Sequence, residues 1–213
     1  MRFRLASGVH ITGERVELGV DKAFVVDWHM DRSPVPIVPA TTLKGWLREG
    51  AERVLRGVGL SACDGSSPQT VCGECLVCKV FGSPQRRSPL RFRDVRLREA
   101  LWDVRANVSL SRHRKAAYEE RLFFSEVAWQ SGFEARVMGV FPSQEEALQA
   151  AALLYLPAQL GVALGAARSR GLGWVELEDF SVRWNGESEP LSRVLQRAEE
   201  ILKGAPEKSE GNG

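Results

Sequence analysis

Four cysteines, Cys63, Cys72, Cys75 and Cys78, lie in one short segment and are the only cysteines of the 213-residue chain. The two-residue spacers of C-x-x-C-x-x-C let neighbouring thiolates converge on one tetrahedral ion at about 2.3 Å, and Cys63 can fold back as the fourth ligand. Two disulfides, which are rare in a reducing compartment, and an iron–sulfur cluster are the alternatives. The pattern favours structural zinc within an insertion over residues 60–84. A site closed by four thiolates leaves no position for catalysis.

A second stretch with chemical potential is residues 164–174, LGAARSRGLGW, here named the glycine-arginine loop. Glycine permits a positive φ or a close approach of the backbone to a ligand, and the guanidinium fork matches phosphate. These residues favour polyanion binding, although an ordinary helix-to-strand turn with solvated arginines fits them equally well. The candidate binding residues of the loop are Arg168, Ser169, Arg170, Gly171 and Gly173.

Two cations lie near the start of a predicted helix. Apolar residues recur at helical spacing over residues 43–55, and Thr41 or Thr42 is expected to cap this helix. Lys44, in the first turn, opposes the helix dipole unless an anion binds the exposed N–H groups. Arg48 lies one turn further on the same face. Lys44 and Arg48 are therefore candidate phosphate contacts, and the alternative is that Lys44 extends away into solvent.

Asp21 is the leading acidic candidate, because it lies in a glycine-containing loop next to Lys22. An aspartate beside a phosphate-binding surface can hold a divalent cation or orient a sugar hydroxyl for attack. The same residue type can also simply stabilise a turn. The three histidines, His10, His29 and His113, are scattered; each could be a general base or an ordinary packing or surface residue.

The elements that must position these residues alternate between strands and helices. Strands are expected where apolar residues alternate, at residues 2–11, 24–27, 90–97, 123–129, 133–141 and 174–184. Helices are expected at residues 43–55, 143–164 and 190–203, the second opening on a capping box. Residues 28–39 contain three prolines and are expected to be irregular. This order predicts an α+β, ferredoxin-like fold, with a bulge between Phe92 and Val95.

The charges divide the chain into a basic middle and an acidic end. Residues 86–122 carry ten arginines and one lysine against five acids, whereas residues 176–210 carry five bases against nine acids. The basic middle favours a polyanionic partner, with a solvated charged face as the alternative. Within it, residues 103–124 have little apolar pattern and are expected to form an exposed excursion. Its candidate binding residues are Arg112, Arg114 and Lys115.

Length and composition set the remaining bounds. A chain of this size suits one domain with insertions, which we place at residues 1–184, followed by a C-terminal helix and disordered tail over 185–213. The sequence contains no uninterrupted apolar run of about 18 residues, so no membrane span is expected. The start, MRFRL, lacks an apolar signal core, so we expect a cytoplasmic protein without membrane attachment.

Four blocks of sequence occur in a characteristic order: GVHITG at 8–13, GVDKAFVVD with PIVPATTLKGWLR at 19–48, CGECLVCKVFG at 72–82, and ARSRGLG at 167–173. Together they resemble the RAMP superfamily of CRISPR–Cas proteins, most closely the Csm-type backbone subunits of type III effector complexes. The resemblance implies a ferredoxin-like (RRM-type) core that stacks with copies of itself and other CRISPR-associated subunits along a CRISPR RNA.

The resemblance also implies roles for individual residues. The first-helix lysine of the family corresponds to Lys44 and its glycine-rich loop to residues 168–173, which implies contacts with the guide, with Lys22 nearby. Residues 103–124 correspond to the family's β-hairpin thumb. In cleaving members an aspartate after the first strand cuts single-stranded target RNA with Mg²⁺ or Mn²⁺, and Asp21 corresponds to it. Non-cleaving filament subunits and metal-independent guide-processing nucleases of the superfamily are the alternatives.

Overall fold

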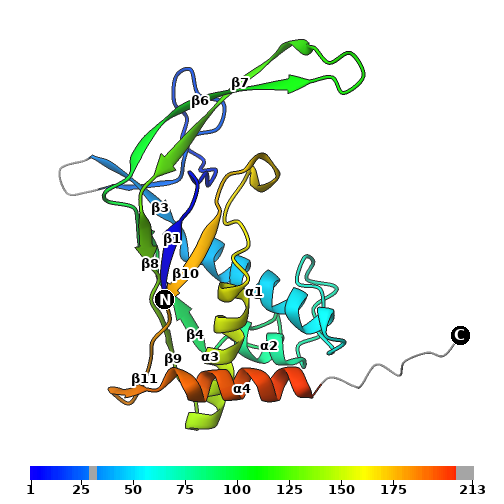
Figure 1. Cartoon of the computed structure of the whole chain (residues 1–213), viewed down its shortest axis with the longest axis vertical. Coiled ribbons are helices and arrows are strands. Elements are labelled where there is room, and N and C mark those ends of the chain that lie inside the picture. Colours follow the sequence, from blue (N-terminus) through cyan, green and yellow to red (C-terminus); the bar gives the residue numbers. More distant parts are fainter. Residues whose placement is uncertain (29–32, 205–213) are drawn as a thin grey trace, which may run out of the picture.

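The computed structural model describes residues 1–28 and 33–204, which form a mixed α/β fold of small antiparallel sheets with four α-helices (Figure 1). The predicted disordered tail and His29 lie outside these residues. The helices are α1 (Ala40–Gly57), α2 (Leu76–Phe81), α3 (Gln144–Gln159) and α4 (Leu191–Lys203), with a 3₁₀ turn η1 (Arg168–Arg170). The strands are β1 (Arg2–Leu5), β2 (Val26–Trp28), β3 (Pro34–Val38), β4 (Leu90–Phe92), β5 (Val95–Arg96), β6 (Leu101–Leu110), β7 (Ala117–Trp129), β8 (Gly132–Glu134), β9 (Val137–Gly139), β10 (Val175–Asp179), β11 (Val182–Trp184) and β12 (Glu187–Glu189).

The sheet that contains the N-terminus has the order β10–β1–β8, with both pairs antiparallel. Only two residues separate β8 from β9, which pairs with β4. Phe3 of β1 is fully buried, and its ring lies 5.5 Å from that of Trp46 on α1 and 5.2 Å from that of Phe133 on β8. This aromatic contact joins the sheet to the first helix, as expected for alternating apolar residues that face a core.

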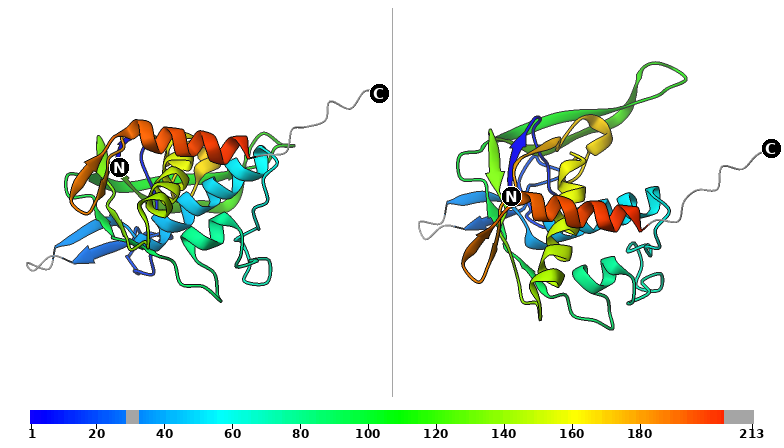
Figure 2. Two further views of the ribbon diagram at one scale, coloured as in Figure 1. Left: turned by 90° about the horizontal axis from the view of Figure 1, so that it is seen from below. Right: turned by 60° about the horizontal axis from the view of Figure 1, so that its bottom comes forward.

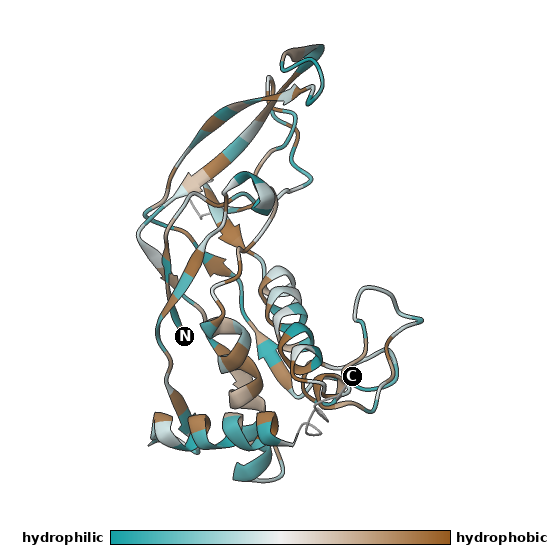
Figure 3. Cartoon of the chain, turned by 45° about the vertical axis from the view of Figure 1, so that its right-hand side comes forward, coloured by the Kyte–Doolittle hydropathy of each residue, from teal (hydrophilic) through white to brown (hydrophobic). Residues whose placement is uncertain are grey.

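Helices α3 and α4 complete the core. The alanine- and leucine-rich α3 is largely buried, and Figure 3 shows it as predominantly apolar, whereas α4 has one apolar side only. Ser143 caps α3 by accepting a hydrogen bond from Glu146 N, as the sequence predicts. Val194 and Ala198 of α4 belong to the same buried cluster. The C-terminal helix therefore packs on the core of the domain.

Several predicted boundaries are wrong. The expected strand 2–11 ends at Leu5, because the chain leaves the β10 edge and Val9 pairs instead with Ala128 on β7. Residues 90–97 contain a break where a bulge was expected, since β4 pairs with β9 and β5 pairs with β3. The helix expected to reach residue 164 ends at Gln159.

The proline-rich segment expected to be irregular contains β3, which pairs with β2 on one side and β5 on the other. Proline lacks a ladder donor, but its carbonyl still accepts: Pro36 O receives a hydrogen bond from Leu97 N at 2.8 Å. At the next boundary, Pro39 is the N-cap of α1, and no side chain of a neighbouring threonine caps it. The carboxylate of Asp94 accepts from Ala40 N at 2.7 Å in its place.

The excursion predicted at residues 103–124 is a long antiparallel hairpin, β6–β7, with register from Leu101↔Trp129 to Val108↔Leu122 and an irregularity before Leu110. It begins earlier and ends later than predicted, because residues 123–129 pair with β6 and form no hairpin with β8. Figure 1 and the right-hand view of Figure 2 show the hairpin projecting beyond the body of the protein.

Candidate functional site

The loop that carries Asp21 lies against β7. The backbone N–H groups of Asp21 and Lys22 both donate to Phe124 O at 3.0 Å, and Asp21 Oδ2 accepts a hydrogen bond from Phe124 N at 2.7 Å. Both side chains are exposed. The structure therefore fixes the position of the Asp21 carboxylate relative to the middle of the hairpin while leaving it open to solvent.

An ion pair between half-buried Arg15 and buried Glu126 stabilises the same loop. Arg15 Nη2 donates to both carboxylate oxygens of Glu126 at 2.6 Å, and Phe24 N donates to Glu126 Oε2 at 2.6 Å. Glu126 is only 7% exposed, and the Arg15 guanidinium carbon lies 5.4 Å from the centre of the Trp102 ring. Sequence reasoning missed this pair, although a single acid within the apolar run 123–129 was a usable signal.

The glycine-arginine loop contains η1 and is tied to the segment after β1. Ala166 N donates to His10 O at 2.8 Å, and Gly173 N donates to Gly8 O at 2.7 Å. The loop also reaches α1, where Arg168 Nη1 donates to Glu49 Oε2 at 3.2 Å. A cavity of about 380 Å³ between the loop and the first turns of α1 is lined by residues of both.

The two loops meet at Phe123 of β7. The Lys22 ammonium lies 5.7 Å from the centre of the Phe123 ring, and the Arg170 guanidinium carbon lies 5.4 Å from it. Within residues 1–28 and 33–204, neither cation has an acidic partner. We name Asp21, Lys22, Phe123 and Arg170 the Phe123 junction. Phe123, the aromatic residue of this junction, was not predicted as a site residue because nothing in the sequence distinguishes it from its neighbour Phe124.

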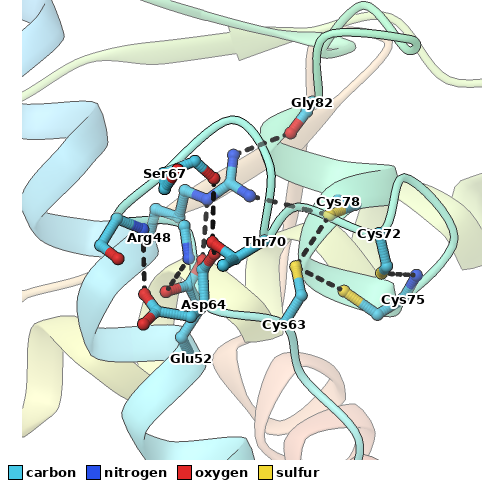
Figure 4. Close-up of polar contacts among 12 residues, drawn as sticks. Arg48, Glu52, Cys63, Asp64, Ser67, Thr70, Cys72, Cys75, Cys78 and Gly82 are labelled. Carbon is cyan, nitrogen blue, oxygen red and sulfur yellow. Dashed lines mark hydrogen bonds and ion pairs between the residues drawn. The ribbon is translucent and has the colours of Figure 1, made fainter.

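The four cysteines converge as predicted (Figure 4). Their sulfur atoms all lie within 4.8 Å of one another, with Cys63 Sγ at 3.2 Å from Cys78 Sγ and 3.6 Å from Cys75 Sγ. A tetrahedron of Zn–S bonds of about 2.3 Å needs sulfur separations of about 3.8 Å, so the donor set fits a zinc ion. The N–H of Cys75 lowers the pKa of the Cys72 thiol to about 6, whereas burial raises that of Cys78 to about 12.

Comparison with known families decides the class of protein. A family model described as the RAMP superfamily matches residues 30–176. The chain belongs to the RAMP superfamily. Membership implies a CRISPR-associated RNA-binding subunit that interacts with CRISPR RNA and other Cas subunits. A search of curated proteins finds no match. In the part of the chain that the structure describes, no helix is long and apolar enough to cross a membrane.

The remaining predicted RNA contacts of this RAMP protein lie near the start of α1, at the tip of the β6–β7 hairpin and around η1. Lys44 is half-buried near the start of α1, and burial, followed by the charge of Arg48, lowers its pKa. The three candidate basic residues of the excursion lie at the exposed tip of the β6–β7 hairpin. These residues are Arg112, Arg114 and Lys115. Ser169, Gly171 and Gly173 lie on or beside η1 with the loop arginines.

Arg48 is placed differently from its prediction as a phosphate contact. Its guanidinium donates to Glu52 Oε1 at 2.9 Å and to Gly82 O at 2.8 Å, and Nη2 lies 3.6 Å from Cys78 Sγ. Each nitrogen of the fork thus has a protein acceptor, on the side of α1 that faces the cysteine insertion. The contacts of Arg48 are thus with α1 and the cysteine insertion, and its role as an RNA contact stays a prediction.

Of the candidate general bases, His10 is only 2% exposed. Its Nδ1 lies 2.6 Å from Glu126 O and its Nε2 lies 3.0 Å from Thr12 Oγ1, and burial lowers its pKa. Both ring nitrogens are thereby occupied, so the packing role weighed for this histidine fits better than the catalytic one. His113 lies at the exposed tip of the hairpin.

Proposed function

We propose that this RAMP protein is a backbone subunit of a Csm-type type III CRISPR effector complex, which polymerises along guide RNA and cleaves bound target RNA at Asp21. The proposed core is ferredoxin-like. The sheet order β10–β1–β8, continued through β9 to β4, with α1 and α3 between the strands in sequence, supports a β-α-β-β-α-β arrangement. The projecting β6–β7 hairpin is proposed to be the thumb.

The Phe123 junction carries this proposal. Two cations, neither with an acidic partner among the described residues, lie within about 6 Å of the centre of one aromatic ring, and the Asp21 carboxylate is hydrogen-bonded to the residue next to that ring. Single-stranded RNA offers phosphates to such cations and bases to such rings. A phosphodiester held by Lys22 and Arg170 would therefore lie close to the Asp21 carboxylate.

The reaction that these groups favour is an internal transesterification. The ribose 2′-hydroxyl attacks the adjacent phosphorus while the bond from phosphorus to the 5′-oxygen breaks, leaving a 2′,3′-cyclic phosphate and a 5′-hydroxyl. Asp21 would orient the 2′-hydroxyl and accept its proton, and a water molecule would protonate the departing 5′-oxygen. Lys22 and Arg170 would neutralise the phosphate. A bound Mg²⁺ or Mn²⁺ would supply further charge stabilisation. Among the described residues only the cysteines form a cluster of three or more ligating groups, so RNA oxygens and water would complete such a site.

The test replaces Asp21 in the assembled complex. Asp21→Asn keeps an acceptor for Phe124 N but removes the base, so cleavage of end-labelled target in Mg²⁺ or Mn²⁺ should fall by about 10²–10⁴-fold while guide RNA still co-purifies. Glu14→Gln, an exposed acid of the same loop, is the matched control and should cleave normally. Cleavage by the Asn variant at the wild-type rate would remove the catalytic assignment.

The second candidate is a subunit that binds RNA without cutting it. The hydrogen bond from Phe124 N to Asp21 Oδ2 favours it, because it gives the carboxylate a purely structural use. The wild-type complex would then yield no products with either metal, and Asp21→Asn would change nothing. A metal-independent guide-processing nuclease would instead cut precursor RNA in EDTA, and the burial of His10 weighs against it.

A further inference from the structure

We infer that Arg48 and Glu52 of α1 form the outer shell of the cysteine site, where they orient its thiolates and tie metal binding to the helix that carries Lys44. The inference needs no RNA and no cleavage, so it stands or falls independently of the proposed function. It assigns to Arg48 a role different from the phosphate contact that the sequence suggested.

The contacts of Arg48 reach the C-terminal part of the cysteine insertion. Arg48 Nη2 lies 3.6 Å from Cys78 Sγ, and Nη1 donates at 2.8 Å to the carbonyl of Gly82, the residue that ends α2. Figure 4 shows the guanidinium between α1 and these two groups. One side chain therefore contacts a candidate metal ligand and fixes the end of the helix from which that ligand projects.

Glu52 reaches the other side of the insertion. Its Oε1 accepts from Arg48 Nε at 2.9 Å, and its Oε2 accepts from the backbone N–H of Gly65 at 3.1 Å. Gly65 lies two residues after Cys63. Glu52 is only 3% exposed, and a buried carboxylate is costly unless it is paired and hydrogen-bonded. The pair therefore holds both the segment of Cys63 and the segment of Cys78 against α1.

The chemistry of a four-thiolate site gives this arrangement a purpose. Four thiolates around a divalent ion carry a net charge of about −2, and a guanidinium that donates to one sulfur offsets part of that charge while fixing the ligand's orientation. Outer-shell partners of this kind typically contribute about 10–100-fold to metal affinity. Because the donor is on α1, metal binding also stabilises the helix turn between Arg48 and Glu52.

The experiment measures zinc affinity of the full chain by competition with a chromophoric chelator, and follows thiolate coordination through the absorption spectrum of the Co²⁺ form. Arg48→Met should weaken zinc binding by about 10–100-fold. Arg48→Lys keeps the charge but loses the guanidinium fork, so its zinc affinity should lie between those of Arg48→Met and the wild type. Glu52→Gln, nearly isosteric, should also weaken binding. The matched control is Arg53→Met, since Arg53 lies on the exposed side of α1 and pairs with Glu49.

Equal affinities of the Arg48→Met and Arg53→Met variants would overturn the inference. If the methionine variant fails to fold, as judged by circular dichroism, Arg48→Lys and Glu52→Gln decide the matter: wild-type zinc affinity in both would overturn it. A wild-type chain that binds neither zinc nor Co²⁺ would overturn it as well. None of these results changes if Asp21 proves not to cleave RNA.

Discussion

The cysteine insertion is contacted by Arg48 of α1, and the Phe123 junction contains Arg170. The sequence presents both arginines as RNA contacts, yet their surroundings are opposite. Arg48 is half-buried, with an acceptor for each nitrogen of its fork. Arg170 is exposed, its guanidinium lies over the face of Phe123, and it has no acidic partner among the described residues. The comparison shows that residue type and loop position do not decide the role of a cation. The acceptors that the fold supplies decide it.

Desolvation explains why the two sites differ. A guanidinium removed from water needs acceptors from the protein, and Glu52 supplies a charge-assisted one to Arg48. Around Lys22 and Arg170, the fold provides an aromatic face, whose attraction for an exposed cation is only about 0.5–1 kcal/mol. Their N–H donors stay available to an anionic ligand, whereas those of Arg48 are already used.

The largest expected difference between the two sites is in their contribution to RNA affinity. Lys22→Ala and Arg170→Ala should each weaken binding of a labelled single-stranded RNA by about tenfold, because each removes a charged hydrogen bond, and the double variant by about 100-fold. Each change should also lower the slope of log affinity against log salt by about one. Fluorescence anisotropy at several salt concentrations gives both quantities.

Two controls accompany that measurement. Lys203→Ala, an exposed cation at the end of α4, should leave the affinity unchanged. Zinc-saturated Arg48→Met should stay within about threefold of wild type, since it removes no available donor. A larger loss for Arg48→Met than for Arg170→Ala would invert the comparison.

The sequence predicted the features that depend on local spacing. The C-x-x-C-x-x-C run places three thiolates together whatever the rest of the chain does, so the cysteine cluster was predicted from residue numbers alone. Helix α1 followed from its apolar period and α3 from its capping box, although the predicted second helix ran five residues too long. The excursion over 103–124 was predicted from its lack of a core-facing pattern, and these residues lie within the longer β6–β7 hairpin.

Features that depend on distant partners could not be predicted in this way. The role of Arg48 depends on Gly82 and Cys78, which only the folded insertion brings to α1. Phe123 gains its importance from Lys22 and Arg170, which lie about 100 and 47 residues away in the chain. Strand β3 escaped prediction because its prolines are tolerated only through the particular register it forms with β2 and β5.

Alanine substitutions at two glycines of the glycine-arginine loop, Gly171 and Gly173, should differ in their effect on stability. Both have positive φ, +82° at Gly171 and +79° at Gly173. A Cβ at Gly171 would meet open space, whereas one at Gly173 would lie 1.9 Å from Leu164 O. Gly171→Ala should therefore lower the free energy of unfolding by only the left-handed strain of about 1–2 kcal/mol. Gly173→Ala should lower it by at least about 2 kcal/mol more, because the backbone must also shift.

Urea unfolding of the two alanine variants measures this difference, and RNA affinity at a temperature where both are folded shows whether the loop still presents Arg170. Gly173→Ala should weaken RNA binding, because it displaces the backbone that ties the loop to Gly8. Equal stabilities of the two variants would mean that the close approach at Gly173 does not hold the loop.

The smallest expected effect concerns His10, which is buried and is influenced by the charges of Lys22 and Arg170. Burial is the largest cause that lowers its pKa, and the charges of Lys22 and Arg170 lower it further. A histidine with a depressed pKa favours the neutral form in the folded state, so its contribution is intact above the unfolded value of about 6.5. It is lost as the pH falls below that value toward the folded pKa. The wild-type free energy of unfolding should therefore fall between pH 7.5 and pH 5 more steeply than that of His10→Gln, by at most about 1.4 kcal/mol per pH unit.

The pH effect also tests the charges of the junction directly. If Lys22 and Arg170 lack acidic partners in solution, their combined replacement by alanine should raise the pKa of His10, which an NMR titration of its ring protons would detect. Zinc saturation is kept constant, because thiol protonation would otherwise add its own pH dependence. An unchanged His10 pKa in the double variant would show that other groups already neutralise Lys22 and Arg170. The cations of the junction would then be paired within the protein, as Arg48 is at the cysteine site.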